Sequence, residues 1–335
     1  MKTIKFVMKL MLAMLPIIIY LFCFIKYEPY NYFGFQTQAA KLATPLERLR
    51  AFLRNPSENI VLGDSRMTHV DLDLAEQLTG KKWSTLSTGG QGVNLTYAFY
   101  EWAKSKVSVQ NIIMDISFYQ VREGNMSPNP EPVIYIAEHP LQYIVTRDYV
   151  LEAFSPWLRT EAGGIAARFS KCTGTVSGLP LAIKALTSAE DNKIEAQQIS
   201  STKYREDLIQ YAQNNIYPGC KNYSISQDAM NSIIHIITDV QDNGGEIKIL
   251  APVVQESIWE YVIIPLGLEA YMEQYKNEIQ KYTEIYDMEW QSRLSEKQDI
   301  FSDGFHFDTN ETYQIYTRNL LGDTDKYLII RGRLQ

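Results

Sequence analysis

NIVLGDSR, residues 59–66, joins a short apolar run to a polar turn. The run over residues 59–62, bounded by Gly63, is typical of a buried strand. Asp64 and Ser65 follow where that strand should end, and an amphipathic stretch comes after them. Ligands of open α/β sheets bind in the crevice outside the carboxyl ends of the strands. The pattern therefore puts the Ser65 hydroxyl where a nucleophile acts, near backbone N–H groups of a helix start that can stabilise an oxyanion.

A second stretch near the other end of the chain, FSDGFHF at residues 301–307, contains the partners that such a serine needs. Asp303 and His306 are three residues apart, which puts both side chains on one side of a turn. The carboxylate can hold one imidazole nitrogen and leave the other free to act as a general base. A serine hydroxyl is unreactive until such a base takes its proton. We therefore expect Ser65, Asp303 and His306 to be catalytic.

Each motif also has a plainer interpretation. Gly-Asp-Ser occurs in ordinary strand-to-helix turns, in which the serine is only an N-cap. Asp-x-x-His occurs in solvated loops. The glycine-rich turn TGGQG at residues 88–92 suggests a phosphate site, but it lacks the lysine of a Walker motif and the full dinucleotide fingerprint. The two motifs are informative together and within the α/β pattern of the chain.

The order of the other apolar runs predicts a sheet. This alternation of strands and helices is typical of a parallel sheet with helices on both faces. The alternation of strands and helices stops over residues 122–227, where we expect a large, mostly helical insertion over the carboxyl edge of the sheet. Further strands are expected at residues 81–87, 110–116, 246–252 and 285–288, and helices at residues 94–104, 228–241, 267–282 and 309–321.

An apolar run, LMLAMLPIIIYLFCFI at residues 10–25, follows Lys2, Lys5 and Lys9. Counted from Phe6, the segment is about 20 residues long, close to the length that spans a bilayer. Because the lysines precede the run, the positive-inside rule keeps the N-terminus in the cytoplasm and the rest of the chain outside. The main alternative is a cleaved signal peptide, although no small-x-small cleavage site follows the run directly.

The expected organisation has three parts. Residues 1–26 are a membrane anchor, residues 27–57 are a juxtamembrane connector, and residues 58–335 are a catalytic domain that carries the insertion. A soluble protein with a buried N-terminal helix is the weakest alternative, because a helix that is apolar on all sides needs lipid or a large core.

Composition excludes some partners. The 335 residues include 32 Lys and Arg against 39 Asp and Glu, a net charge of −7. Because phosphate binding needs a basic face, nucleic acid is not an expected partner. The chain has no Cys-x-x-Cys and no zinc-like spacing of His and Cys, so we expect no metal and no other cofactor. Cys172 and Cys220 could pair in an oxidising compartment, which the sequence alone does not decide.

Three segments resemble blocks of a known family, the SGNH (GDSL-type) hydrolases. GDS at residues 63–65 resembles the first block, and DGFH at residues 303–306 resembles the last, Asp-x-x-His. Gly90 stands where the second block has its oxyanion glycine, with Gly89 and Gly92 as near alternatives. The resemblance leaves the insertion unexplained.

The resemblance covers roughly residues 58–120 and 228–322. It implies a flavodoxin-like α/β/α sandwich with three layers and a parallel sheet. It also implies Ser-His-Asp acyl chemistry, with the N–H groups of Ser65 and Gly90 as the oxyanion hole.

The third block departs from the family pattern, Gly-x-Asn-Asp, whose Asn donates to the oxyanion. The corresponding stretch here is DISFYQ at residues 115–120, which has no Asn. Ser117, Tyr119 or Gln120 could substitute. Loss of one oxyanion donor costs about 2.7–4 kcal/mol in other enzymes, so the hole is either rebuilt or poor.

Two residues are candidate substrate ligands. Arg66 stands where the family usually has Leu, and it either binds an anionic polymer or only covers the helix start. Tyr119 is the second candidate, in the loop after the third strand.

The layout of anchor, outward domain and Gly-Asp-Ser-Arg resembles one branch of the family, the SGNH-like proteins of cell-envelope polymer acylation. This branch includes the D-alanyl transfer protein of teichoic acid synthesis and the partners of membrane-bound O-acyltransferases that acetylate exported polysaccharides. The resemblance implies an extracytoplasmic, membrane-anchored O-acyltransferase or esterase that acts on such a polymer. The alternative is a non-catalytic module of the same fold that binds a polymer or a membrane-bound O-acyltransferase.

Overall fold

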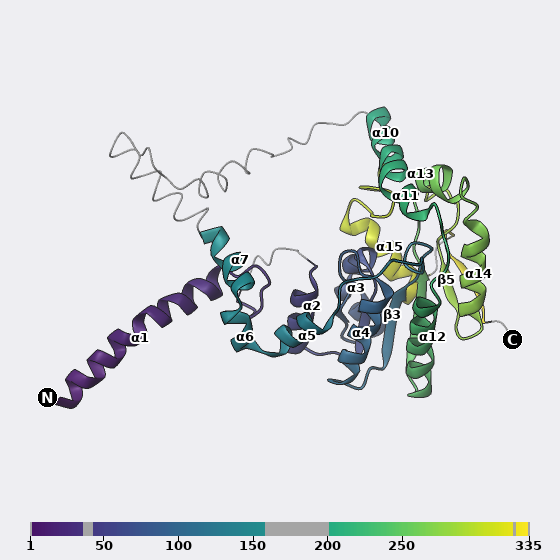
Figure 1. Ribbon diagram of the computed structural model, residues 1–335. Helices are drawn as coiled ribbons and strands as arrows, with labels where there is room; N and C mark the ends of the chain where they lie inside the picture. Colours follow the sequence, from purple (N-terminus) through teal and green to yellow (C-terminus); the bar gives the residue numbers. More distant parts are fainter. Residues whose placement is uncertain (1, 36–42, 158–200, 324–325, 334–335) are drawn as a thin grey trace, which may run out of the picture. The chain divides into compact units, whose positions relative to one another are not determined.

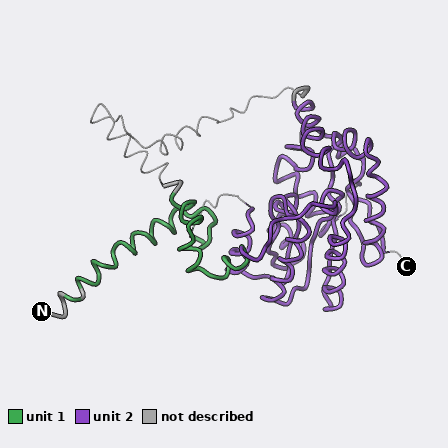
Figure 2. Tube along the Cα trace, in the orientation of Figure 1, with its two compact units in different colours: residues 1–42, 133–198 green, residues 43–132, 199–335 purple. Residues whose placement is uncertain are grey.

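The computed structural model describes residues 2–35, 43–157, 201–323 and 326–333 (Figure 1). The chain divides into two compact units (Figure 2). One unit comprises residues 1–42 and 133–198, and the other comprises residues 43–132 and 199–335. We call them the helical unit and the sheet unit. Cys172 lies outside the described residues, and Cys220 is a buried free thiol.

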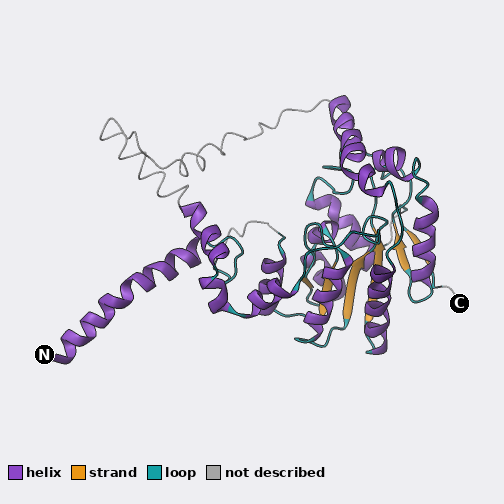
Figure 3. Cartoon of the chain, in the orientation of Figure 1, coloured by secondary structure: helices purple, strands orange, loops and turns teal. Residues whose placement is uncertain are grey.

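The sheet unit is an α/β structure with helices around a six-stranded sheet (Figure 3). The strand order is β2-β1-β3-β4-β5-β6, and every pair is parallel except β5 with β6. The order 2-1-3-4-5 places a topological switch point between β1 and β3, where ligands bind in doubly wound sheets. The strands are β1 (Asn59–Leu62), β2 (Ser84–Thr85), β3 (Asn111–Asp115), β4 (Glu246–Ala251), β5 (Ile285–Asp287) and β6 (Ile329–Arg331).

The expected parallel sheet is therefore confirmed, with one correction at its edge. Residues 285–288 were expected to form the last strand, but β6 follows and pairs antiparallel to β5. Its three residues, which follow a closing helix, are too short to give an alternating pattern. Arg331 of β6 donates to Asp287 at 2.5 Å, so an ion pair helps to hold this short edge strand in place.

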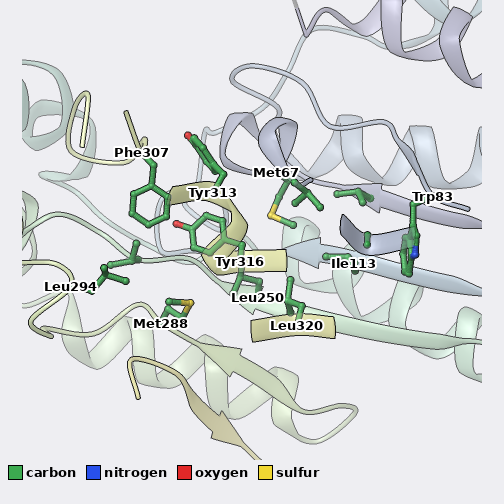
Figure 4. Packing of buried hydrophobic residues seen from close by; sticks show 14 of the residues in the cluster. Met67, Trp83, Ile113, Leu250, Met288, Leu294, Phe307, Tyr313, Tyr316 and Leu320 are labelled. Atoms are coloured by element: carbon green, nitrogen blue, oxygen red, sulfur yellow. The ribbon is translucent and has the colours of Figure 1, made fainter. Parts of the chain in front are cut away.

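Helices pack on both faces of the sheet because successive strand residues point to opposite sides. Val61, Ile113 and Leu250 point to one face, where they share a buried cluster with Tyr313, Tyr316 and Leu320 of α15 (Figure 4). On the other face α4 and α12 pack against each other and against strands β1 and β4. The sheet-unit helices include α2 (Pro45–Arg54), α3 (Leu72–Thr79), α4 (Val93–Lys104), α10 (Ser201–Tyr211), α11 (Tyr217–Cys220), α12 (Gln227–Asp242), α13 (Glu256–Ile258), α14 (Glu269–Gln280) and α15 (Asn310–Leu321).

Residues 43–57, expected in the connector, belong to the sheet unit. They form α2, whose buried face includes Leu46, Leu49 and Phe52. The Phe52 ring lies 5.5 Å from the ring of Trp102 on α4. A helix with such a buried face is part of the core rather than a linker, and its short amphipathic pattern did not reveal this partner.

The expected insertion also divides between the two units. Residues 133–198 belong to the helical unit, and residues 199–227 belong to the sheet unit. The helical unit contains the N-terminal helix α1 (Lys2–Tyr27), most of α5 (Glu131–Glu138), α6 (Pro140–Val145) and α7 (Arg147–Trp157). Within α1, residues Met8–Tyr27 have a mean hydropathy of 2.3, so this helix is long and apolar enough to cross a membrane.

Candidate active site

Ser65 lies at the carboxyl end of β1, as the strand-turn pattern predicts. Gly63 forms the turn with φ +127°, and a Cβ at this position would lie 1.8 Å from Oδ1 of Asp115. Only glycine permits so close an approach. Asp64 then caps a single turn of 3₁₀ helix (Ser65–His69), because its side chain accepts the N–H of Arg66 at 2.9 Å. Ser65 is the first residue of that turn, and its side chain is half-buried at a cavity.

His306 and Asp303 lie in a narrow loop that its own ends close. Phe301 and Phe307 form an antiparallel bridge, with ring centroids 5.1 Å apart. The N–H of Ser302 donates to the carbonyl of His306 at 2.8 Å. These contacts fix the loop, so its two polar side chains are held rather than free in solvent.

The Asp303 carboxylate holds the His306 ring in one orientation. Its oxygens lie 2.8 and 2.9 Å from Nδ1 of the ring. Oδ1 also accepts the N–H groups of Phe305 and His306, at 2.7 and 2.9 Å. Burial disfavours the charged form of Asp303, but these hydrogen bonds outweigh it and hold the pKa of the carboxyl below its usual value. The carboxylate therefore stays charged beside the imidazole at neutral pH.

Ser65 completes the arrangement from the other end of the chain. Its Oγ lies 2.5 Å from Nε2 of His306, across 241 residues of sequence. The structure thus brings together the three residues that the sequence analysis selected. With Nδ1 bound to Asp303, Nε2 is the ring atom that can take a proton from a hydroxyl.

The two amides expected to form an oxyanion hole line the same cavity. Thr88 donates to the carbonyl of Gly63 at 3.3 Å and Gly89 donates to the carbonyl of Ala43 at 3.3 Å, which hold the turn beside β1. Gly90 has φ +65° in this turn. Within the described part of the chain, no group accepts the N–H of Ser65 or of Gly90. Two amide donors are therefore available to a ligand in the cavity.

The cavity has a volume of about 200 Å³ and an aromatic wall. Rings of Tyr119 and Tyr211 lie 5.5 and 6.5 Å from the ring of Phe305. Tyr211 and Ile216 come from the part of the insertion that belongs to the sheet unit. The sequence analysis expected this segment over the carboxyl edge but did not identify its cavity residues. The lining comprises Asp64, Ser65, Arg66, Gly90, Gln91, Tyr119, Gln120, Asn125, Tyr211, Ile216, Phe305 and His306.

The loop after β3 brings polar side chains to the cavity. Tyr119 and Gln120 line the cavity, but Ser117 does not. Gln120 directs its Nε2 to Oδ1 of Asp115 at 3.0 Å, so this amide donor is engaged. Asn125, which the sequence analysis missed, also lines the cavity, and its Nδ2 makes only a 3.3 Å bond to the carbonyl of Gln120. No pattern in the sequence separates Asn125 from other loop asparagines.

Arg66 does not lie as an exposed ligand for a polymer would. It is 2% exposed, and its Nη2 donates to Oδ2 of Asp64 at 2.6 Å and to Ser117 at 2.7 Å. Its Nε donates to Asp64 as well, at 3.1 Å. Of the two interpretations of Arg66, the geometry favours the one in which it braces the helix start. A second carboxylate, Asp115, lies 3.6 Å from Nη2.

These two buried carboxylates share one guanidinium, and their pKa values move apart. Burial disfavours the charge of Asp64, but Arg66 outweighs it and holds the pKa of this carboxyl below its usual value. Burial and the nearby charge of Asp64 raise the pKa of Asp115 well above its usual value. No net charge is buried beneath Ser65 when Asp64 and Arg66 are charged and Asp115 is neutral, and the two pKa shifts favour this combination.

One further group of side chains has the atoms of a metal site. Ligand atoms of Glu101, His235 and Asp239 lie within 4.8 Å of one another. The ammonium of Lys104 already donates to Asp239 at 2.6 Å, and the hydroxyl of Tyr100 donates to the same carboxylate. A cation is thus already present there, so we assign no metal to this group.

Comparison with known proteins adds no family to this geometry. No protein-family model and no curated protein match the chain.

Proposed function

We propose that the protein is a membrane-anchored serine acyl-transfer enzyme of the SGNH hydrolase type, with a flavodoxin-like sheet domain. The observation that carries the proposal is the continuous chain of hydrogen bonds from Ser65 through His306 to Asp303. It lies at a cavity beside the carboxyl end of β1, which is lined by Ser65 and Gly90, the two residues whose amides have no acceptor in the described part of the chain. Solvated loops and N-cap serines do not need this combination.

The first half of the reaction makes an acyl-enzyme. Oγ of Ser65 attacks the carbonyl carbon of an ester or thioester, and Nε2 of His306 takes the hydroxyl proton. The N–H groups of Ser65 and Gly90 stabilise the negative oxygen of the tetrahedral intermediate. When the intermediate collapses, the bond to the leaving oxygen or sulfur breaks. His306 then gives its proton to the leaving group.

The second half regenerates the serine. Nε2 of His306 takes a proton from an acceptor hydroxyl, whose oxygen attacks the acyl carbon. The proton returns to Oγ of Ser65 as the ester bond to the enzyme breaks. The acceptor is a hydroxyl of a cell-envelope polysaccharide or a teichoic acid-like polymer in a transferase, and water in an esterase.

The cavity supports a short acyl group. A volume of about 200 Å³ has room for an acetyl- or aminoacyl-sized group and part of a sugar, but not for a long chain. Tyr119 and Phe305 bring aromatic side chains to the wall of this cavity, and such side chains suit contact with a sugar ring. Asn125 and the hydroxyl of Tyr119 are the side-chain donors that could replace the missing Asn of the third block.

The proposed location is extracytoplasmic. Helix α1 would anchor the protein, and the lysines before its apolar run favour a cytoplasmic N-terminus. A membrane-bound O-acyltransferase on the same side of the membrane is a candidate acyl donor or partner.

The test uses the full chain in lipid nanodiscs. A fluorophosphonate probe should label the wild type, and a chromogenic acetate ester should be hydrolysed. Ser65→Ala and His306→Ala should abolish both signals. Ser232→Ala is the matched control, because it removes a serine hydroxyl that bonds only to its own helix. Absence of labelling in a folded wild type would overturn the proposal and favour the non-catalytic binding module.

A further inference from the structure

Helix α1 is exposed along its first part and packed along its last. From Phe6 to Ile19, each large apolar side chain that the structure describes is at least 43% exposed. From Tyr20 to Tyr27 covered and exposed side chains alternate: Phe24 is fully buried, whereas Phe22 is 67% exposed. The cover comes from α6 and α7 of the same helical unit.

Specific contacts define this packing. The hydroxyl of Tyr20 donates to the carbonyl of Ile144, and its ring stacks on Phe154 with centroids 5.8 Å apart. The ring of Phe24 meets the edge of Tyr143 at 5.3 Å. Helices α6 and α7 are therefore held against the last two turns of α1.

The length of the uncovered part is too short for a membrane. Residues 6–19 are 14 residues, or about 21 Å of helix at 1.5 Å per residue. The hydrocarbon core of a bilayer is about 30 Å thick. The helix cannot supply the difference at its first end, because Lys2, Lys5 and Lys9 lie there. The missing length, about six residues, is the segment Tyr20–Ile25, which α6 and α7 cover on one side while Phe22 stays exposed.

The exposed side chains of α6 and α7 include large apolar ones among polar ones. Leu141 is 78% exposed and Val145 is 68% exposed, and they lie one turn apart on α6. On α7, Leu151 is 57% exposed. These exposed apolar side chains lie on short helices that pack against the apolar span. Polar residues at the start of α7, Arg147 and Asp148, are exposed as well.

We propose that α6 and α7 lie in the interface of the bilayer beside α1, with Leu141, Val145 and Leu151 in the lipid. A pair of short helices at this level, apolar toward the acyl chains and charged toward the headgroups, is typical of interfacial membrane segments. The inference extends the anchoring part of the proposed function and does not depend on its acyl chemistry. The occupant of these apolar side chains is lipid rather than a protein, because the helices that carry them pack against the span itself.

The test places single reporters on the full chain. Cys23→Ala, Cys172→Ser and Cys220→Ala remove the natural thiols, and Leu141→Cys, Val145→Cys and Leu151→Cys then carry an environment-sensitive fluorophore. The protein is reconstituted in vesicles of phosphatidylethanolamine and phosphatidylglycerol with or without nitroxide-labelled acyl chains. We expect quenching at least about twofold stronger than at the controls, because the quencher is confined to the acyl region.

Matched controls make the outcomes distinct. Gln142→Cys and Asp148→Cys are on the same two helices and should be quenched by iodide from water instead. Leu12→Cys, in the exposed part of α1, reports whether the anchor is in lipid. Lipid quenching at Leu12→Cys with iodide quenching at Leu141→Cys, Val145→Cys and Leu151→Cys would overturn the inference alone. Shielding of these three from both quenchers would overturn it in favour of a protein partner.

A failure of the anchor is recognised separately. If Leu12→Cys is quenched by iodide, then α1 does not cross the bilayer and the inference fails with it. The fluorophosphonate result would still stand, since Ser65 belongs to the sheet unit.

Discussion

Two buried charge clusters in the sheet unit differ in how completely their atoms are paired. Beneath Ser65, the side chains of Asp64, Arg66 and Asp115 leave Nη1 of Arg66 and Oδ2 of Asp115 without a hydrogen-bond partner. We call this group the site cluster. We interpret these unpaired atoms as a cost in stability that the site cluster tolerates for function, because unpaired buried polar atoms concentrate at functional sites.

The second group, the edge cluster, lies under β5. The ammonium of Lys276 contacts Asp287 at 3.0 Å and Glu289 at 3.3 Å. Glu289 also accepts the N–H of Phe118 at 3.1 Å and the hydroxyl of Tyr275. None of its polar side-chain atoms in the described structure is buried without a partner. The edge cluster thus has the pairing expected of a purely structural network.

The largest effect should come from the loop that holds His306. Asp303→Asn keeps the shape of the side chain but removes the charge that fixes the ring and stabilises its protonated form. We expect ester hydrolysis to fall about 10³–10⁴-fold, as when the orienting carboxylate of other triads is replaced. Turnover of the acetate ester measures this, with thermal unfolding as the control for folding. A fall below tenfold would remove Asp303 from the catalytic machinery.

The edge cluster should give the opposite result. Lys276→Met leaves Asp287 and Glu289 buried with less compensation, although Arg331 still contacts Asp287. Breaking a buried ion pair from one side costs about 3–5 kcal/mol. Urea unfolding of the sheet-unit signal should show this loss. Probe labelling per folded molecule should stay at the wild-type level, and a proportional loss of labelling would contradict the division between the two clusters.

The site cluster itself contains an asymmetry between its two carboxylates. Asp64→Asn should cost about 3 kcal/mol, because it leaves the Arg66 charge buried with a neutral partner. Asp115→Asn should cost less than about 1 kcal/mol, since the raised pKa of Asp115 favours a neutral carboxyl, whose shape the amide keeps. Denaturant unfolding of both variants at pH 7 compares them directly. Equal costs would show that the charge is shared between the two carboxylates.

The same asymmetry predicts a pH dependence. A carboxyl whose pKa is raised on folding binds more protons in the folded state, so stability falls as pH rises from the unfolded pKa to the folded one. Burial raises the pKa of Asp115 and of Glu289 in this way. Asp64 and Asp303 have lowered pKa values, so their contribution is instead lost in acid, as pH falls below the unfolded pKa.

Asp115→Asn should therefore gain stability relative to the wild type as pH rises above about 4, the unfolded pKa of Asp. Unfolding curves between pH 4 and the neutral range test this sign. A difference that does not change over that range would mean that Asp115 is charged in the folded protein.

Much of the scaffold could be predicted because its signals are local. A four-residue apolar run such as NIVL, residues 59–62, indicates a buried strand without reference to the rest of the chain. In the same way Thr309 indicates the start of α15, where its side chain accepts the N–H of Thr312. The three hydrogen-bonded residues could be selected because Asp303 and His306 are close in sequence and Ser65 follows a strand end.

What could not be predicted depends on contacts between distant segments. The sequence around Arg66 does not show whether its side chain faces solvent or pairs with Asp64. The orientation depends on distant groups such as Ser117 after β3, which accepts a hydrogen bond from Arg66. Tyr211 and Ile216 reach the cavity through the fold of the insertion, which has no periodicity that marks them. The three residues of β6 are assigned to the sheet by their pairing with β5.

A small effect on turnover should come from the turn that contains Gly90, and it separates backbone strain from catalysis. Gly90→Ala meets no atom within 4 Å of its new Cβ, so its cost in stability should arise from the positive φ alone. A left-handed conformation costs an L-residue about 1–2 kcal/mol. If the turn keeps its shape, the amide still reaches the oxyanion and turnover should fall less than about tenfold, whereas unfolding should shift by that cost. If instead turnover collapses while stability is kept, the turn has relaxed to negative φ and withdrawn its N–H. Hydrolysis and unfolding measured on the same preparation therefore decide whether the Gly90 amide contributes to the oxyanion hole. The control for strain is Gly124→Ala, because Gly124 also has a positive φ and open space around it but does not line the cavity.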